Sequence, residues 1–147
     1  MDIYMYLKKD HQKVTTLFNE IENSDSISNK ESLFSQLKEE LLLHAESEHA
    51  TFYKALKSYP ETKDIVQHAD KEHAEVKASL DKISSCPSND EEWLVLLDEL
   101  KDSVEHHIKE EEGEMFNKAR SLLDEKTEKK LVDDIEELKK KLKTHKA

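Results

Sequence analysis

Residues 106–116 read HHIKEEEGEMF and place His107 four residues before Glu111. Both positions continue a series of apolar residues at helical spacing, which predicts a helix with an imidazole and a carboxylate on its buried face. Residues 44–53, HAESEHATFY, repeat this spacing with His44 and Glu48. An unpaired buried carboxylate costs several kcal/mol, so two such positions predict a partner for them in the core.

The composition indicates a helical protein and excludes several functional classes. Charged residues make up 39% of the chain, which contains one glycine and two prolines. Glycine-rich phosphate loops and the nucleophile elbow of α/β-hydrolases need more than one glycine, so these motifs are excluded. The net charge of −11 opposes contact with phosphate backbones, and we expect no nucleic-acid partner.

The N-terminal residues MDIYMYLKKDH contain no long apolar run after a positively charged segment. We therefore expect neither a signal peptide nor a membrane span, and we expect a cytoplasmic protein with no membrane partner. The single cysteine, Cys86, cannot form an intramolecular disulfide, and we expect no role for it.

Turn-forming residues divide the chain into five predicted helices. They gather at NSDSISN (23–29), SYPE (58–61), SSCPSND (84–90) and around Asp124. Four long segments joined by short loops predict an all-α protein, an up-and-down antiparallel four-helix bundle over residues 1–123. Residues 124–147 predict an additional amphipathic helix that packs on the bundle or extends from it.

Three of these boundaries carry a recognisable helix start. Ser28 followed by Glu31 resembles a capping box, and Pro60 suits the first turn of a helix. Asp90, followed by two glutamates, predicts the start of the fourth helix.

Each long helix has an apolar face that is interrupted only by histidine or glutamate. The predicted inward positions are Ile3, Leu7, His11, Val14, Phe18 and Ile21; Leu33, Leu37, Leu41, His44, Glu48, Phe52 and Leu56; Ile65, Ala69, His73, Val76, Leu80 and Ile83; and Trp93, Leu97, Leu100, Val104, His107, Glu111, Met115 and Leu122.

Distance from the connecting loops predicts that these polar positions share one layer of the core. Residues equally far from a loop lie side by side in an antiparallel pair. By this criterion His11 is level with His44, and Glu48 with His73, within one helical turn. The level of His107 depends on where the third loop is centred.

Four imidazoles and two carboxylates in one layer can hold two divalent metal ions with the carboxylates bridging them. Mixed nitrogen and oxygen ligation suits iron first, with manganese or zinc as alternatives. The absence of paired cysteines argues against an iron–sulfur cluster. We therefore expect a metal site built from His11, His44, Glu48, His73, His107 and Glu111.

The segments KKDHQKV, HAESEHATFY, KEHAEV and HHIKEEEGEMF, in this order, resemble the hemerythrin-like HHE cation-binding family over residues 1–123. The resemblance implies a centre of two non-haem iron ions, bridged by carboxylates and by an oxo or hydroxo group. It also implies a role in reversible O₂ binding, in oxygen or redox sensing, or in iron handling. The ligands that it implies are His11, His44, Glu48, His73, His107 and Glu111.

The third helix departs from the pattern of the oxygen-carrying hemerythrins, which have two histidines four residues apart there. Here the residues four before and four after His73 are Ala69 and Lys77. His68 could join the site only in a distorted helix, and His49, at the edge of the inward face, suits an exposed or supporting role. One ligand fewer leaves an open position on one metal, which favours chemistry with O₂, peroxide or NO over stable O₂ carriage.

Several neighbours of the ligands need a separate interpretation. Tyr53 and Tyr6 could approach the site and hydrogen-bond a ligand, or they could only pack. Gly113 could permit close helix packing or be an incidental interior glycine. We expect the remaining polar neighbours to face solvent: His106, Glu110, Glu112 and Glu114.

Three functions fit this pattern. We expect a binding protein rather than an enzyme. Its iron would bind or sense O₂, another diatomic ligand or peroxide, or the protein would serve in iron handling. The first alternative is an oxidoreductase that acts at the same site on peroxide, NO or ferrous iron. The second is a metal-free helical interaction module. The apolar positions 131, 135, 138 and 142 of the last helix would also suit a homodimer contact or a protein partner.

Overall fold

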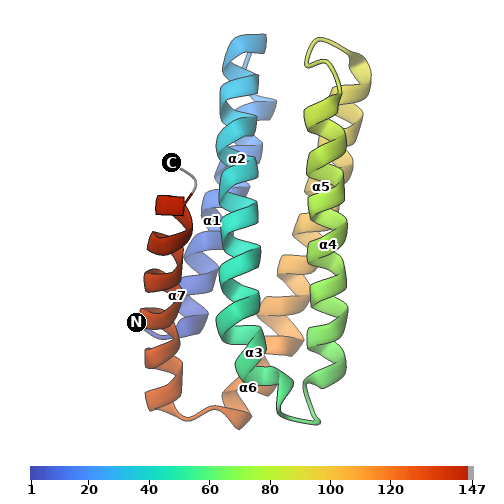
Figure 1. The fold of residues 1–147 in the computed structure, drawn as a ribbon. Helices are drawn as coiled ribbons and strands as arrows, with labels where there is room; N and C mark the ends of the chain where they lie inside the picture. The colour runs from blue at the N-terminus through green and yellow to red at the C-terminus, as the bar shows by residue number, and fades with distance from the viewer. Residues whose placement is uncertain (146–147) are drawn as a thin grey trace.

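The structure, a computed structural model, describes residues 1–145 and arranges them in five helical rods (Figure 1). The last two residues of the predicted fifth segment lie outside this range. The rods are formed by α1 (Ile3–Glu22); by α2 (Ile27–Glu48), η1 (His49–Tyr53) and α3 (Lys54–Lys57); by α4 (Lys63–Ser85); by α5 (Glu91–Glu110), η2 (Glu111–Met115) and α6 (Phe116–Leu122); and by α7 (Glu125–His145). No strand occurs among the described residues, so the predicted all-α class is confirmed.

The first four rods form the bundle, and the fifth lies on its outside. α1 contacts α2, and α4 contacts α5, as the short connections between them require. α7 packs against α1 and α2, at the left edge of the bundle in Figure 1. Leu131 and Ile135 of α7 are buried within the chain, so these two residues are not available for the dimer contact that the sequence allowed.

Two of the three predicted helix starts are wrong by a few residues. The hydroxyl of Ser26 accepts the backbone N–H of Asn29, so α2 begins earlier than expected and Ser28 lies inside its first turn. Pro60 lies in a turn, because α4 begins only at Lys63. The hydroxyl of Thr62 donates to the carbonyl of Leu56 across this turn.

The start predicted at Asp90 is confirmed. Its carboxylate accepts the backbone N–H of Glu92 at 3.1 Å, which satisfies one of the free donors at the beginning of α5. Asp124 has the same function for α7, because its carboxylate accepts the N–H of Thr127 at 2.8 Å.

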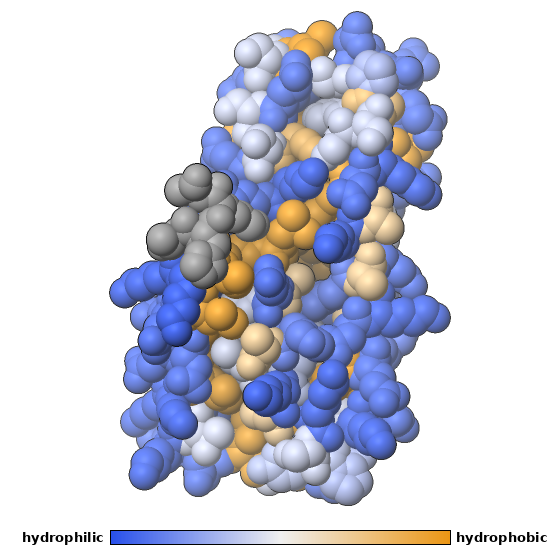
Figure 2. Space-filling model, in the orientation of Figure 1, coloured by the Kyte–Doolittle hydropathy of each residue, from blue (hydrophilic) through white to orange (hydrophobic). Residues whose placement is uncertain are grey.

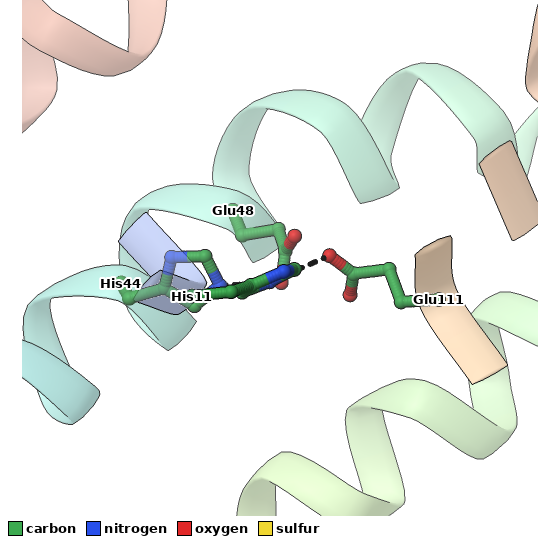
Figure 3. Close-up of side chains that lie close together, drawn as sticks. All are labelled: His11, His44, Glu48 and Glu111. Carbon is green, nitrogen blue, oxygen red and sulfur yellow. Dashed lines mark ion pairs between the residues drawn. The ribbon is translucent and has the colours of Figure 1, made fainter. Parts of the chain in front are cut away.

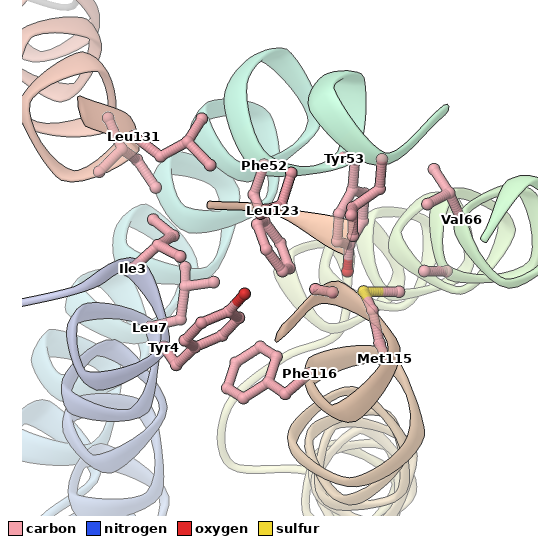
Figure 4. Packing of buried hydrophobic residues seen from close by; sticks show 14 of the residues in the cluster. Ile3, Tyr4, Leu7, Phe52, Tyr53, Val66, Met115, Phe116, Leu123 and Leu131 are labelled. Atoms are coloured by element: carbon pink, nitrogen blue, oxygen red, sulfur yellow. The ribbon is translucent and has the colours of Figure 1, made fainter. Parts of the chain in front are cut away.

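The apolar core consists of two clusters separated by a polar layer. The Phe52 cluster lies at the end of the bundle that contains α3 and α6, and it includes Leu7, Leu56, Ala119 and Leu131. The aromatic rings of Tyr4, Phe52 and Phe116 meet edge to face within it (Figure 4). The Phe18 cluster occupies the other half of the bundle and includes Trp93. On α1, His11 lies between Leu7 of the first cluster and Val14 of the second, which places the polar layer between the two clusters.

Two π-helical turns, which the spacing of the sequence did not predict, interrupt the second and fourth rods. η1 begins directly after Glu48, and η2 begins at Glu111. A π turn contains one extra residue, so it shifts the inward face of the helix that follows by one position. This shift explains why Leu123 is buried where the α-helical spacing predicted Leu122, which is only half-buried.

The surface is mostly hydrophilic in the view of Figure 2, with a strip of hydrophobic residues where α7 meets the rest of the bundle. Within residues 1–145, no helix combines the length and the apolar composition that crossing a lipid bilayer requires.

Candidate metal centre

Six side chains from the four rods of the bundle meet in the polar layer, and they form two overlapping sets of four. The first set is His11, His44, Glu48 and Glu111 (Figure 3). The second set is Glu48, His73, His107 and Glu111. Donor atoms within each set lie within 4.8 Å of one another, and both sets share both carboxylates. The structure therefore brings together all six residues that the sequence singled out.

Neighbouring donor atoms are separated as they would be around a single ion. In the second set, the Nε2 atoms of the two histidines are 3.0 Å apart, and that of His73 is 3.4 Å from Oε1 of Glu48. In the first set, Nε2 of His11 is 3.3 Å from Oε1 of Glu111, and Nε2 of His44 is 3.3 Å from Oε1 of Glu48. Adjacent ligands held at about 2.1 Å from one ion are roughly 3.0 to 3.4 Å apart.

The two carboxylates are placed between the sets. Oε1 of Glu111 faces His11, whereas its Oε2 lies 3.2 Å from Nε2 of His107. Oε1 of Glu48 faces one histidine of each set, His44 and His73. Each carboxylate can therefore contribute to both sets at once.

Three of the four imidazoles are held in place by a second carboxylate at Nδ1. An Nδ1–H that donates to a carboxylate leaves Nε2 with a free electron pair for a metal ion. The pairs are His11 with Glu112 at 2.6 Å, His44 with Asp10 at 2.9 Å, and His107 with Glu72 at 2.9 Å.

The shared carboxylates strongly influence each other's ionisation. Burial and the charge of Glu111 raise the pKa of Glu48 well above its usual range. Burial opposes ionisation of Glu111 too, but its interactions with Glu48, His107 and His11 outweigh the effect of burial and lower the pKa of Glu111. These opposite directions favour one proton shared by the buried pair when no cation is bound.

The pKa values of the two histidines in the second set are also shifted in opposite directions. Burial, and then the charge of His107, lower the pKa of His73 to about 3, so this imidazole is neutral. For His107, burial acts in the same direction, but Glu111 and other carboxylates outweigh it and raise the pKa to about 9. The centre therefore attracts positive charge.

The ring of Tyr53 lies against the second set. Its hydroxyl donates to Oε2 of Glu111 and lies 3.2 Å from Nε2 of His107 and 3.4 Å from Nε2 of His73. The ring stacks on that of His73, with centroids 5.2 Å apart. Tyr53 reaches this position because η1 brings residues five apart, such as Glu48 and Tyr53, onto the same side of the helix.

The donors fit metal binding because the protein leaves buried polar atoms without partners there. Among the described residues, the atoms that are buried with no hydrogen-bond partner include Nε2 of His11 and of His44, both oxygens of Glu48 and Oε1 of Glu111. Buried polar groups normally have partners, and each unsatisfied group costs about 1 to 3 kcal/mol. A cation between the two sets would provide the missing partner.

The charges of the surrounding groups fit the same interpretation. The carboxylates in contact with the four histidines come from Asp10, Glu48, Glu72, Glu111 and Glu112, and Lys139 contacts Asp10. Five carboxylates and one ammonium group carry a net charge of −4 when all are ionised. Two divalent cations would neutralise this charge in a region of low dielectric constant.

A cavity of about 240 Å³ connects the surface with this layer. It lies between α4 and the fourth rod, and His107 and Glu111 line it together with Ile65 and Ala69. Its acidic lining residues are Asp64, Glu72, Glu110, Glu111 and Glu114.

The other predicted neighbours have mixed outcomes. His106 is exposed, as expected, and pairs with Glu110 at 2.9 Å. The prediction that Glu112 faces solvent is wrong. The π turn directs its side chain toward His11, and only 30% of that side chain is exposed. Tyr6 packs against Lys139 of α7, whose ammonium group is 4.8 Å from the ring centroid.

The additional histidines lie outside the two sets. His49 is exposed and bonds to Asp70 at 2.7 Å. His68 is also exposed and forms a separate group with Glu72 and Glu110 at the surface. His68 does not join the second set, because α4 is regular and directs its side chain away from the core.

Gly113 does not mediate close helix packing. A Cβ atom at this position would meet no neighbouring atom within 4 Å, so the space around it is open.

Sequence reasoning missed the residues that hold the histidines. Glu72 directly precedes His73 in the chain but bonds to His107, and Asp10 directly precedes His11 but bonds to His44. An acidic residue next to a predicted ligand was the signal available. It could not identify the partner, because that partner belongs to another helix.

A helical bundle with a buried centre of histidines and glutamates defines a class of metal-binding proteins. The family model of the Hemerythrin HHE cation binding domain matches residues 2–119, and this chain belongs to that family. The resemblance proposed from the sequence is therefore confirmed.

Two relatives and one solved structure are similar to this chain. A DNA nickase from Nostoc sp. is 30% identical over 129 residues, which cover 87% of this chain but only 36% of the nickase. An uncharacterized hemerythrin-like protein from Schizosaccharomyces pombe is 28% identical over 139 residues, covering 93% of this chain and 68% of that protein. The crystal structure of a Hemerythrin HHE cation binding domain-containing protein from Mycobacterium kansasii has a TM-score of 0.82 at 22% identity, covering 96% and 89% of the two chains.

Proposed function

We propose that this protein holds two non-haem iron ions in the polar layer and binds O₂ or a related small ligand there, in oxygen or redox sensing or in iron handling. The observation that supports this proposal best is the sharing of both carboxylates by two four-residue sets. A site for one ion needs one such set. Two sets with common carboxylates are what a pair of bridged ions requires.

The residues would have distinct roles. His11 and His44 would hold one ion, and His73 and His107 would hold the other, with Glu48 and Glu111 shared between them. Iron in such a mixed nitrogen and oxygen environment supplies electron exchange with O₂, peroxide or NO when it is bound. Manganese and zinc accept the same donors and remain the alternatives for the metal.

Tyr53 makes the two halves of the centre unequal. Its oxygen lies beside His73, His107 and Glu111, so it adds a fifth donor to the second set. The first set offers four donors. Tyr53 would thus supply, beside His73, a donor that the third helix lacks.

Metal analysis tests the proposal directly. Protein purified from iron-replete cells should contain two iron ions per chain and show near-ultraviolet charge-transfer bands that change on reduction and on exposure to air. His107→Ala should lose metal and these bands, whereas the exposed neighbour variant His106→Ala should keep both. One metal ion per chain, with Glu48 or Glu111 dispensable, would contradict the two-iron centre.

A second candidate function is an oxidoreductase that acts on peroxide, NO or ferrous iron. The cavity that reaches His107 and Glu111 favours it, because a substrate would need such a path to the buried centre. Turnover of one of these substrates that disappears in Glu111→Gln would establish this function. Spectral changes without turnover would support binding or sensing alone.

Two other functions have less support. A metal-free interaction module would leave the buried atoms of His11, His44, Glu48 and Glu111 without partners, and metal-free protein with native stability would be needed to support it. The nickase relative acts on DNA by its name, but this chain spans about a third of that protein, and its net charge of −11 opposes binding to DNA. A cytoplasmic location and the absence of a nucleic-acid partner stay predictions.

A further inference from the structure

The C-terminal helix α7 lies outside the residues that match the family, which end at residue 119. Its apolar face packs onto the bundle through Leu131, Val132 and Ile135, all of which belong to the Phe52 cluster. One turn further along the same helix, Lys139 extends toward α1 instead of toward solvent, and its side chain is only 12% exposed. The helix therefore contributes both apolar packing and one buried charge to the bundle.

Lys139 is joined to the candidate metal centre through two direct contacts. Its ammonium group donates to Oδ2 of Asp10, and the same oxygen accepts Nδ1–H of His44 at 2.9 Å. The Asp10 side chain is 6% exposed and that of His44 is 9% exposed, so the contacts are shielded from water. Shielded, charge-assisted hydrogen bonds are stronger and more directional than those at a surface.

The contacts determine how His44 can act. An imidazole that donates from Nδ1 presents an unprotonated Nε2, and Nε2 of His44 is one of the buried atoms without a partner. Asp10 can hold the ring in this orientation only while its own carboxylate is fixed. Lys139 fixes that carboxylate through the oxygen that His44 also contacts, and the ring of Tyr6 lies 4.8 Å from the ammonium group.

We propose that Lys139 is a positioning residue for the metal ion of the first set, and that docking of α7 and occupancy of that ion stabilise each other. This inference rests on the proposed function. If α7 is docked, Asp10 and His44 are oriented for the ion. Since coupling between two sites is reciprocal, an ion bound at His44 must favour docking of α7 by the same factor.

The inference predicts an effect on one ion and not on the other. The second set is held by Glu72 at His107 and by Tyr53, neither of which contacts Lys139 in the described structure. Losing a residue that orients a metal ligand commonly reduces metal affinity about 10- to 100-fold. Lys139→Met should therefore weaken one of two binding steps by about this factor and leave the other step unchanged.

The matched variants are Lys139→Met, Lys139→Arg and Lys141→Met. Methionine keeps the apolar stem of Lys139 and removes its charge, and arginine restores the charge and the donors. Lys141 lies on the same helix, its side chain is 67% exposed, and it pairs with Glu137, so Lys141→Met controls for the loss of a lysine from α7. Stepwise titration of Fe²⁺ against a chelator under anaerobic conditions measures both affinities.

The expected result is a weakened single step in Lys139→Met, recovery in Lys139→Arg, and wild-type binding in Lys141→Met. Mössbauer spectra of the fully loaded variants should show a change in one of two iron signals. Equal weakening of both steps, or two unchanged steps, would overturn the inference while wild-type binding of two ions still upheld the proposed function. A wild-type chain that binds no iron would instead remove the proposed function itself.

Hydrogen exchange of the wild-type chain, with and without iron, gives an independent measurement. Loading with iron should slow amide exchange in α7, although this helix contains none of the six proposed metal ligands. Lys139→Met should abolish this slowing. Exchange in α7 that is identical with and without iron in the wild type would overturn the inference.

Discussion

The hydroxyl of Tyr53 donates a hydrogen bond to Oε2 of Glu111, a residue 58 positions later in the chain. The bond joins the two π-helical turns, because Tyr53 ends η1 and Glu111 begins η2. π turns are rare and often occur at functional sites. Here each follows or includes the glutamate of an H-x-x-x-E pair, so the irregular backbone coincides with the candidate centre.

Replacing Tyr53 with phenylalanine should change the iron spectrum. A phenolate bound to ferric iron absorbs visible light, so the oxidised wild-type protein should have a visible band that Tyr53→Phe lacks. The metal-free variant should also lose about 1 to 3 kcal/mol of stability, because Glu111 loses a buried donor. Optical spectra and urea unfolding measure the two effects. Tyr59→Phe is the control, and a visible band that persists in Tyr53→Phe would show that its oxygen does not bind iron.

Glu48→Gln should have opposite effects on stability and on metal binding. Both Glu48 oxygens are buried without hydrogen-bond partners, and its pKa is raised because burial and the charge of Glu111 oppose its ionisation. The amide should stabilise the metal-free protein by about 1 to 3 kcal/mol, because it removes this electrostatic cost. Iron binding should fall to at most one ion per chain. Urea unfolding with a chelator present and iron analysis measure these outcomes.

The exposed residue of the same helix, Glu46, provides the control for this variant. Glu46→Gln should change neither quantity measurably. A Glu48→Gln protein that is less stable without metal than the wild type would contradict the interpretation that the carboxylate pair is held at a cost for function.

Glu112→Gln should weaken iron binding although Glu112 is not in either set. Its carboxylate lies 2.6 Å from Nδ1 of His11 and orients that ring. We expect about a 10- to 100-fold loss of affinity with two ions still bound at saturation. Chelator competition measures the loss. Glu114→Gln, two residues along and 65% exposed, should bind iron as the wild type does, and equal effects of the two variants would exclude a specific role for Glu112.

Gly113→Ala should stabilise the protein. The glycine lies inside η2 with a negative φ, and an added methyl group would meet no atom within 4 Å. Alanine restricts the unfolded chain more than glycine does and favours helix, which should add about 0.5 to 1 kcal/mol to the free energy of unfolding. Urea unfolding measures this change. A loss of stability, or a loss of iron, would show that η2 requires the flexibility of glycine.

Much of the candidate site could be predicted because helical periodicity is a local property of the sequence. Spacing of three and four residues is enough to assign His11, His44, His73 and His107 to inward faces, and the structure buries or half-buries each of them. Beyond Glu48 and Glu111 the same spacing still predicts the buried residues Phe52, Leu56 and Met115, but it does not predict where every neighbour points. The spacing there assumes an α-helix, and the extra residue of each π turn moves Tyr53 and Glu112 toward the centre.

The sequence by itself determined the helical class, the number of rods and the six inward polar residues, because composition and periodicity act within each helix. Only the tertiary structure decided how the rods align. Their packing brings Asp10 to His44, Glu72 to His107 and Lys139 to Asp10, and it docks α7 against α1 and α2. These contacts join residues on different helices, so their partners depend on the relative level and rotation of whole rods, which no local spacing specifies.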